Sequence, residues 1–276
     1  GSGKTTLGMS ILNAIEPPGK IATGTIEYEG KNVLEMRRKQ LRKYQWSEVS
    51  MVFQSAMNSL NPVRPAIDPI VEALREHEKV KKREARKKAI ELISETGVPA
   101  DRSEGFPFEF SGGMRQRVVI ALALALSPKL LIADEPTSAL DVVTQKQILR
   151  LLKKYLVEKH LSLIFITHEI ALLVGLVENV SVMYKGEMVE LGPLKEVIEE
   201  PLHPYTETLL RTVLSVGTPK EVLYGLDSVF EERKAVETKG CKYAGTCKYV
   251  FDRCRVERPQ LLEVRKGRWV SCHKYS

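Results

Sequence analysis

The sequence predicts an α/β fold, in which helices alternate with short buried strands. Apolar runs of four to six residues alternate with stretches of helical length, which is typical of a sheet covered by helices. Hydrophobic residues make up 43% and charged residues 28% of the 276 residues, a globular composition that excludes a disordered chain. The longest apolar run, residues 118–126, is far shorter than the roughly 20 residues of a membrane-spanning helix, and no secretory leader is evident.

The first half of the chain is expected to form a helix, two short strands and a long charged helix. In chain order, we expect a helix at 5–15, strands at 25–28 and 49–53, a proline-containing loop at 58–69 and a helix at 70–96. Pro17-Pro18 and Gly97 are the expected stops of the two helices.

The second half is expected to continue the alternation and to end in a hairpin. In chain order, we expect a helix at 115–126, a strand at 130–133, a helix at 143–159, a strand at 161–166 and a hairpin of 180–184 with 188–190. The first of these strands ends in Asp134 and Glu135, and the second ends at Thr167-His168. Buried parallel strands deliver such side chains at their carboxyl ends.

A phosphate-binding loop opens the sequence. GSGKTT matches the second half of the P-loop, G-x-x-x-x-G-K-[ST], although a chance glycine-rich turn is the alternative. Glycines let backbone N–H groups close around phosphate, and the following helix presents its N-terminus to the anion. The expected nucleotide-binding residues are Gly1, Ser2, Gly3, Lys4, Thr5 and Thr6. Because the motif's first glycine would precede Gly1, we expect a longer chain and weak ATP binding by these residues alone.

Two further motifs carry candidate chemistry. The run LLIADE at 130–135 matches the apolar strand with acids that accompanies a P-loop: Asp134 would hold Mg²⁺ and Glu135 would polarise the attacking water, whereas a capping acid pair is the plainer alternative. The run FSGGMRQ at 110–116 precedes the apolar helix, so Ser111 can cap that helix and Gly112 and Gly113 can approach an anion. A plain N-cap with a tight turn is the alternative here.

In this order, the motifs resemble those of the nucleotide-binding subunits of ATP-binding-cassette (ABC) transporters. The matching positions are residues 1–5 for Walker A, Gln54 for the Q-loop glutamine, 111–114 for the signature, 130–135 for Walker B, 138–141 for the D-loop and His168 for the switch histidine. Phe110, Met114 and Glu169 depart mildly from the commonest residues of the family.

The resemblance implies a P-loop NTPase with a RecA-like core and specific residue roles. Residues 1–200 would be the nucleotide-binding domain, with a helical subdomain at about 61–126 that carries the signature, and 201–276 a small C-terminal extension. The implied catalytic residues are Glu135, His168 and Gln54. Thr5, Gln54 and Asp134 would hold Mg²⁺, and Ser111, Gly112, Gly113 and Asp141 would contact ATP across a head-to-tail dimer.

Within the family, the stretches 53–62, 109–118 and 201–206 most resemble the oligopeptide/dipeptide ATPases. This resemblance implies an ATPase that energises peptide import at the cytoplasmic face of the membrane. Its implied partners are a second homologous ATPase in a heterodimer, two membrane permeases and an extracytoplasmic solute-binding protein. Oligosaccharide or nickel uptake is the alternative cargo, and a soluble ABC ATPase or a non-hydrolysing regulatory module is the alternative class.

The C-terminal tail carries the net charge of +7 and all four cysteines. Residues 233–276 hold 12 Lys and Arg against 4 Asp and Glu, so the rest of the chain is near neutral. Summed charge alone would suggest nucleic-acid binding, but with its charge confined to the tail we expect no nucleic-acid partner. The spacing C-x₅-C-x₆-C-x₁₇-C fits zinc pairs poorly, and some similar ATPases carry a cluster on such an extension. We therefore expect a 4Fe–4S cluster on Cys241, Cys247, Cys254 and Cys272, with Zn²⁺, disulfides or free thiols as alternatives.

Overall fold

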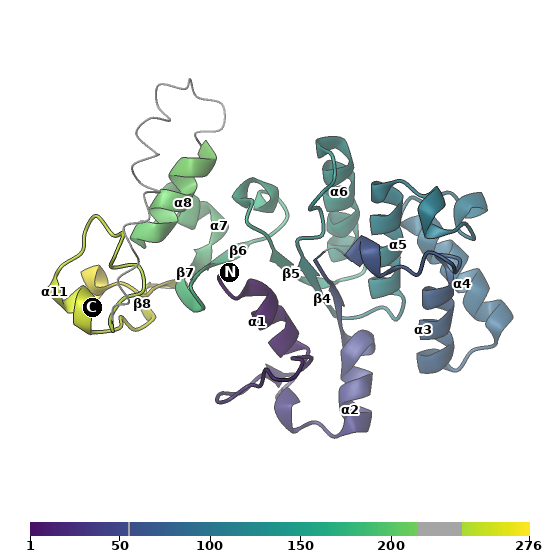
Figure 1. The fold of residues 1–276 in the computed structure, drawn as a ribbon, viewed down its shortest axis with the longest axis horizontal. Coiled ribbons are helices and arrows are strands. Elements are labelled where there is room, and N and C mark those ends of the chain that lie inside the picture. The colour runs from purple at the N-terminus through teal and green to yellow at the C-terminus, as the bar shows by residue number, and fades with distance from the viewer. Residues whose placement is uncertain (55, 215–238) are drawn as a thin grey trace. The chain divides into compact units, whose positions relative to one another are not determined.

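The structure, a computed structural model, describes residues 1–54, 56–214 and 239–276. It divides into two compact units, one of Thr5–His168 and one of Gly1–Lys4 together with Glu169–Ser276 (Figure 1). Part of the expected extension, residues 215–238, lies outside the described ranges. The domain boundary at residue 200 therefore stays a prediction.

A three-stranded parallel sheet forms the centre of the Thr5–His168 unit. The strands are β3 (Val49–Val52), β4 (Leu130–Asp134) and β5 (Ser162–Ile166), in the order β3-β4-β5. Val49 lies opposite Leu130, and Leu130 opposite Ser162, so the strands run in register. Because all three are parallel, their carboxyl ends meet at one edge of the sheet, as the sequence predicted for β4 and β5.

Helix α1 (Lys4–Ile11) packs closely against this sheet at Gly8. A Cβ atom at Gly8 would lie 3.2–3.3 Å from side-chain carbons of Met51, Ile132 and Ile166, which is tighter than ordinary packing. The helix ends at Ile11, earlier than expected. The hydrophobic core beside it consists of Leu12, Val33, Tyr44, Val49, Ile132 and Ile166.

The expected strand at 25–28 is only partly formed. It is the two-residue strand β1 (Glu27–Tyr28), which pairs with β2 (Lys31–Asn32) in a small antiparallel hairpin before α2 (Arg38–Lys43). Short polar strands of this kind carry little hydrophobic signal, so the second one was not predicted.

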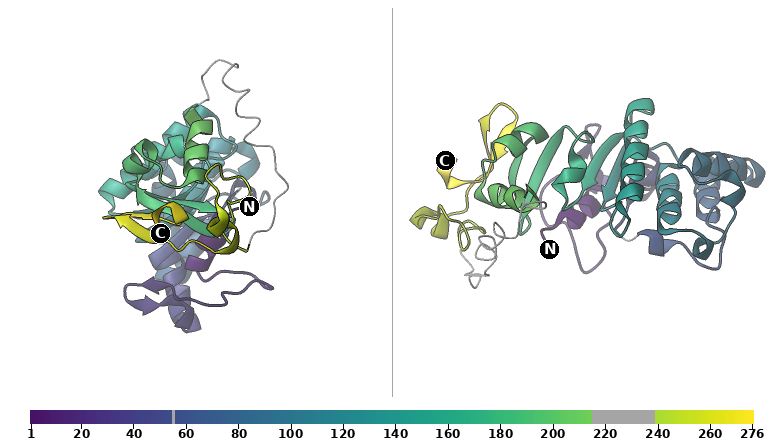
Figure 2. Two further views of the ribbon diagram at one scale, coloured as in Figure 1. Left: turned by 90° about the vertical axis from the view of Figure 1, so that its left-hand side faces the viewer. Right: turned by 90° about the horizontal axis from the view of Figure 1, so that it is seen from above.

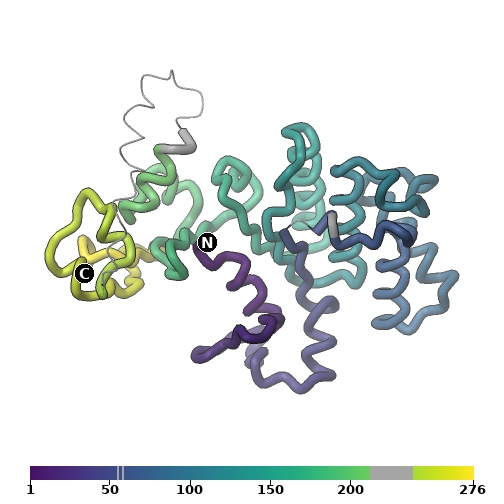
Figure 3. Tube along the Cα trace, viewed as in Figure 1, coloured from purple at the N-terminus to yellow at the C-terminus, as the bar shows by residue number. Residues whose placement is uncertain are grey.

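Three helices form the part of this unit between β3 and β4. They are α3 (Asp68–Glu78), α4 (Lys82–Glu95) and α5 (Gly112–Leu124), and Figure 3 traces them as neighbouring coils. The single helix expected at 70–96 is wrong, since Lys79 adopts the left-handed conformation (φ 58°) and ends α3. Helix α6 (Val142–Glu158) follows β4 close to its expected bounds.

An antiparallel sheet organises the other unit. Its order is β6-β7-β9-β8, from β6 (Asn179–Tyr184), β7 (Glu187–Pro193), β9 (Arg268–Val270) and β8 (Leu262–Arg265). The hairpin β6–β7 was predicted, whereas the addition of β9 and β8 from the C-terminus was not. Figure 2 shows these yellow strands beside the green hairpin. The helices of this unit are α7 (Leu194–Glu199), α8 (Pro204–Leu214) and α11 (Asp252–Val256).

A buried ion pair fastens the C-terminal strands to the hairpin. Arg268 Nη2 on β9 donates to Glu190 Oε1 on β7 at 2.8 Å, and the side chains are 1% and 0% exposed. Glu190 also accepts backbone N–H bonds from Leu202 and His203, both at 2.9 Å. Buried charges are retained only when they are paired in this way. In the described part of the chain, no helix is both long and apolar enough to cross a membrane.

Candidate functional site

The phosphate-binding loop is held by its own side chains and by a backbone hydrogen bond. Gly3 has φ +88°, a conformation that favours glycine. Lys4 Nζ donates to Ser2 Oγ at 3.1 Å, and the Ser2 carbonyl accepts the Gly186 N–H at 3.0 Å. Thr5 and Thr6 lie in the first turn of α1, where backbone N–H groups have no partner within the helix. Loop and helix start are therefore built as an anion-binding site.

The two acids predicted after β4 lie in different surroundings. Asp134 is the last residue of the strand and is 1% exposed. Glu135 has φ +46°, and its N–H donates to the Ile166 carbonyl at 2.9 Å. This left-handed turn directs the two carboxylates differently at the carboxyl edge of the sheet.

The structure brings together three residues that the sequence predicted separately. Gln54 Nε2 donates to Glu135 Oε2 at 2.9 Å, and His168 Nδ1 lies 2.8 Å from Glu135 Oε1. Gln54 follows β3 and His168 follows β5, so both flank Glu135 from the neighbouring strands. An ionised carboxylate only accepts hydrogen bonds, so the His168 proton lies on Nδ1 when the pair is formed. Held at both oxygens, Glu135 is oriented to act as a base.

Ser111 is the N-cap of α5, as predicted. Its Oγ accepts the Met114 N–H at 3.3 Å. A Cβ atom at Gly113 would lie 2.5 Å from Thr144 Cγ2, whereas one at Gly112 would make an ordinary contact with Leu140 at 3.6 Å. Close packing against the start of α6 therefore accounts for glycine at position 113. A part for Ser111, Gly112 and Gly113 in nucleotide binding stays a prediction.

Asp141 is the N-cap of α6. Its Oδ1 accepts the N–H groups of Val143 and Thr144 at 3.0 Å, and Thr144 Oγ1 donates to Oδ2 at 2.6 Å. The hydrogen bonds from Thr144 are the main cause that lowers the pKa of Asp141 below its usual value. Its role in nucleotide binding also stays a prediction.

The expected iron–sulfur cluster is contradicted, as is the zinc alternative. Among the residues that the structure describes, no group of three or more His, Cys, Asp or Glu side chains could hold a metal ion. The four predicted ligands, Cys241, Cys247, Cys254 and Cys272, line one small cavity as free cysteines without a disulfide between them. Burial raises the pKa of Cys247 to about 11 and also raises those of Cys241 and Cys272. Neutral thiols are favoured, whereas metal ligation needs thiolates.

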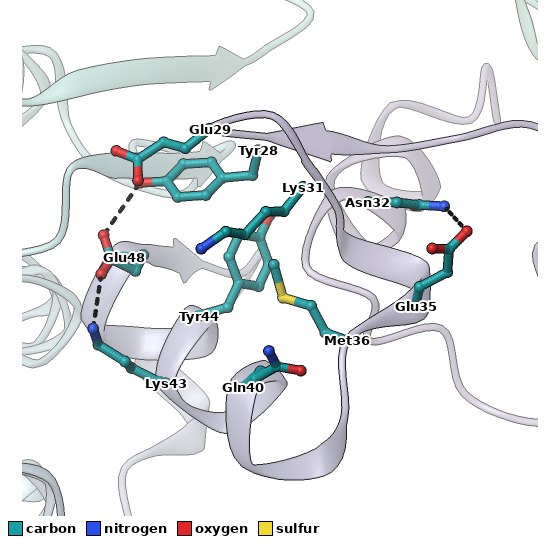
Figure 4. Close-up of a pocket in the computed structure, with 10 residues that line it drawn as sticks. All are labelled: Tyr28, Glu29, Lys31, Asn32, Glu35, Met36, Gln40, Lys43, Tyr44 and Glu48. Atoms are coloured by element: carbon teal, nitrogen blue, oxygen red, sulfur yellow. Dashed lines mark hydrogen bonds and ion pairs between the residues drawn. The ribbon is translucent and has the colours of Figure 1, made fainter.

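A larger pocket of about 470 Å³ lies in the Thr5–His168 unit, between the β1–β2 hairpin and α2. Figure 4 shows Tyr28 and Tyr44 within it, with ring centroids 5.2 Å apart. Glu48 accepts from the Tyr28 hydroxyl at 3.4 Å and pairs with Lys43 at 3.7 Å. Burial raises the pKa of Tyr44 to about 12. None of the residues predicted for the functional site lines this pocket, and no motif in the sequence marks it.

The fold and the opening loop define the class of the protein: it is a P-loop NTPase. The ABC transporter family matches residues 1–138, and the family described as oligopeptide/dipeptide transporter, C-terminal region, matches residues 189–254. The chain therefore belongs to the ABC transporter family, as an ATPase of the dipeptide/oligopeptide importer type.

Individual relatives agree with this assignment. The dipeptide transport ATP-binding protein DppD of Escherichia coli (strain K12) is 39% identical over 275 residues, 99% of this chain and 84% of the relative. The oligopeptide transport ATP-binding protein AppD of Bacillus subtilis (strain 168) is 39% identical over 278 residues, covering 100% of this chain and 84% of the relative.

A solved structure of an ATP-binding cassette supports the enzymatic activity. The dimeric post-hydrolysis cassette MJ0796, bound to ADP and Pi, matches with a TM-score of 0.60 and 29% identity, over 70% of this chain and 81% of that one. The chain is thus an ATPase, and its family implies binding of ATP and Mg²⁺.

Proposed function

We propose that this chain is the ATP-hydrolysing subunit that energises the import of dipeptides or oligopeptides. Its relatives are named as dipeptide and oligopeptide transport ATP-binding proteins. The match of residues 189–254 to the C-terminal region of such transporters favours this cargo over oligosaccharides or nickel.

The arrangement around Glu135 is the observation that carries the proposed chemistry. Glu135 is the general base: it accepts a hydrogen bond from the water that attacks the γ-phosphorus of ATP. Gln54 and His168 hold its two oxygens at 2.9 and 2.8 Å, so the base needs little reorganisation. A non-hydrolysing regulatory module would not need this arrangement.

Residues 1–6 bind the phosphates of ATP. Lys4 supplies a positive charge to the β- and γ-phosphates, and backbone N–H groups at the start of α1 supply donors. The short Lys4–Ser2 hydrogen bond keeps the ammonium close to the loop in the absence of nucleotide.

The residues present fit Mg²⁺. Asp134 offers a buried carboxylate, Thr5 a hydroxyl and Gln54 an amide oxygen, which are the hard oxygen donors that this ion prefers. When bound, Mg²⁺ would neutralise charge on the β- and γ-phosphates. Burial of Asp134 keeps its carboxylate in one orientation for this purpose.

The start of α5 completes the ATP site of a second subunit. Ser111, Gly112 and Gly113 present a helix N-terminus suited to a phosphate, and Asp141 lies at the next helix start. In a head-to-tail pair, one chain would contribute half of each of two sites. The second subunit is a homologous ATPase, and the pair binds two membrane permeases at the cytoplasmic face of the membrane. An extracytoplasmic solute-binding protein delivers the cargo.

Substitution of Glu135 tests the hydrolytic part of this proposal. In the full-length protein assembled with its transport partners, Glu135→Gln should lower ATP turnover by about 10²- to 10⁴-fold, since it removes the base. Equilibrium ATP binding should persist. The matched control is Glu158→Gln at the exposed end of α6, which should leave turnover unchanged. Undiminished turnover in Glu135→Gln would reject the role of this residue.

Uptake into proteoliposomes tests the cargo. The assembled transporter should accumulate a labelled dipeptide or short peptide only with ATP, and Glu135→Gln should abolish that accumulation. ATP-dependent uptake of an oligosaccharide or of Ni²⁺, without uptake of peptide, would replace the peptide assignment by one of those cargoes.

A further inference from the structure

The turn between β6 and β7 has an uncommon backbone. Its two central residues, Lys185 and Gly186, have φ values of +46° and +82°. Positive φ at both positions is the geometry of a type I′ turn, which fits the twist of a hairpin. A lysine in the left-handed region is unfavourable on its own, so neighbouring groups must stabilise this turn.

One side of the turn touches the phosphate-binding loop, backbone to backbone. Gly186 N–H donates to the Ser2 carbonyl at 3.0 Å. At Gly3, the position of a Cβ atom lies 3.6 Å from Gly186 Cα and 3.9 Å from Met183 Cε. The conformation of the turn therefore bears directly on the conformation of residues 2 and 3.

Lys242, from the C-terminal extension, binds the same turn. Its Nζ donates to the Lys185 carbonyl at 2.7 Å and forms an ion pair with Glu187 at 3.2 Å. These two contacts lie on either side of Gly186 in the sequence. The lysine thus ties both neighbours of the residue that bonds to the phosphate-binding loop.

The residue after Lys242 anchors it to the same hairpin. The ring of Tyr243 meets that of Tyr184 edge to face at 5.3 Å and that of Tyr205 at 5.6 Å. Its hydroxyl lies 3.2 Å from Thr208 Oγ1 on α8. Because Tyr243 is buried at 7% exposure, the backbone at Lys242 is fixed relative to the turn.

We propose that Lys242 is a positioning residue for the phosphate-binding loop, and that it acts through the Lys185-Gly186 turn. Without its two contacts, the turn would sample other conformations and the Gly186–Ser2 bond would open more often. The loop would then lose part of its preorganisation for the anion. The consequence for ATP rests on the proposed function, whereas the ordering of the loop does not.

Hydrogen–deuterium exchange on the full-length protein without nucleotide tests the ordering. Lys242→Met keeps the aliphatic stem and removes the donor, so peptides covering residues 1–8 and 183–190 should exchange about threefold to tenfold faster, as expected for the loss of one hydrogen bond. Lys242→Arg, which keeps a cationic donor, should restore most of the protection. The matched control is Lys248→Met, because Lys248 lies in the same extension but pairs with Glu207 on α8.

ATP affinity, measured by equilibrium binding on the same variants, tests the consequence. Lys242→Met should raise the Kd for ATP by about threefold to tenfold and leave kcat within twofold, since the loop positions phosphate but performs no chemistry. Exchange and affinity equal to those of Lys248→Met would overturn the inference. Absence of ATP binding in the unsubstituted protein would instead reject the proposed function, while the exchange rates would still decide whether Lys242 orders the loop.

Discussion

Burial holds the side chain of His203 in its neutral form. The residue is 1% exposed, and its burial lowers the pKa of the imidazole to about 4. Tyr205 N–H donates to His203 Nδ1 at 3.0 Å, so Nδ1 must be the unprotonated nitrogen. Protonation would place a charge among the tyrosines of this unit and would break that hydrogen bond.

The stability of this unit should therefore fall in mild acid. The pKa of His203 is lower in the folded than in the unfolded state, where it is about 6.5, so protons bind preferentially to the unfolded chain. The contribution is constant above about pH 6.5 and is lost as the pH falls towards 4, by about 3 kcal/mol at most. Urea unfolding at several pH values measures it.

His203→Asn is the matched variant, because its amide oxygen can accept the Tyr205 N–H and does not titrate. The difference in unfolding free energy between the two proteins should shrink between pH 6.5 and 4. Parallel pH profiles would show that His203 is not the titrating group.

Gly113 is expected to tolerate no side chain. In Gly113→Ala, the new methyl would meet Thr144 Cγ2 at 2.5 Å, and Thr144 cannot rotate without breaking its hydrogen bond to Asp141. Overpacking of this kind costs about 1–3 kcal/mol of unfolding free energy, which denaturant titration would measure.

Two variants make this prediction specific. Gly112→Ala at the neighbouring position should be nearly neutral, since its methyl would meet Leu140 at 3.6 Å. Adding Thr144→Ser to Gly113→Ala should recover most of the loss, because it removes the clashing methyl group. A double variant as unstable as Gly113→Ala would locate the cost elsewhere.

At the scale of elements, the attachment of β9 to β7 depends on one charged pair. Arg268→Met would leave the Glu190 carboxylate buried without its cation and should lower the unfolding free energy of this unit by about 3–5 kcal/mol. Thermal or urea unfolding measures the loss.

Arg265→Met is the matched control. Arg265 pairs with Glu200 on the same pair of strands, but both side chains are more than half exposed. The loss of such a surface pair should cost at most about 1 kcal/mol. Equal destabilisation by the two variants would show that burial of the pair is unimportant.

Elements with a strong apolar period were predictable, and those fixed by single contacts were not. The strands at 49–53, 130–133 and 161–166 lie where expected because each is a buried apolar run. The break of the charged helix at Lys79 left no comparable signal, since a lysine in the left-handed conformation has no sequence signature. Likewise, β8 and β9 join the sheet through pairing with residues about 80 positions earlier in the chain.

The functional site shows the same division. Gln54, Glu135 and His168 were predicted one at a time from motifs, and only the structure shows them in contact. The opposite holds for the cysteines: their number and spacing suggested a cluster, but the sequence could not show that they are buried as neutral thiols. Lys242 was named only as a charge near the cysteines, because its contact with the turn is long-range.

At the scale of the whole molecule, the basic tail faces acidic partners within its own unit. Lys242 and Arg258 pair with Glu187, Lys248 with Glu207, Arg265 with Glu200 and Arg268 with Glu190. The five cations thus neutralise glutamates of the segment from β7 to α8. The excess of positive charge in the tail therefore complements this segment and does not form a surface for nucleic acid.

This pairing predicts the response to DNA. Non-specific binding needs several Lys or Arg side chains that are available to phosphates, and it gives a Kd of about 10⁻⁴ to 10⁻⁶ M near physiological salt. The protein should bind a fluorescent 20-base-pair duplex more weakly than about 10⁻⁴ M in an anisotropy titration. Substituting Glu187→Gln and Glu207→Gln together should strengthen binding, because Lys242, Arg258 and Lys248 lose their carboxylate partners. Glu158→Gln and Glu199→Gln, each of which is paired only with a lysine one helical turn away, form the matched control. Micromolar binding by the unsubstituted protein would show that the tail is available to nucleic acid after all.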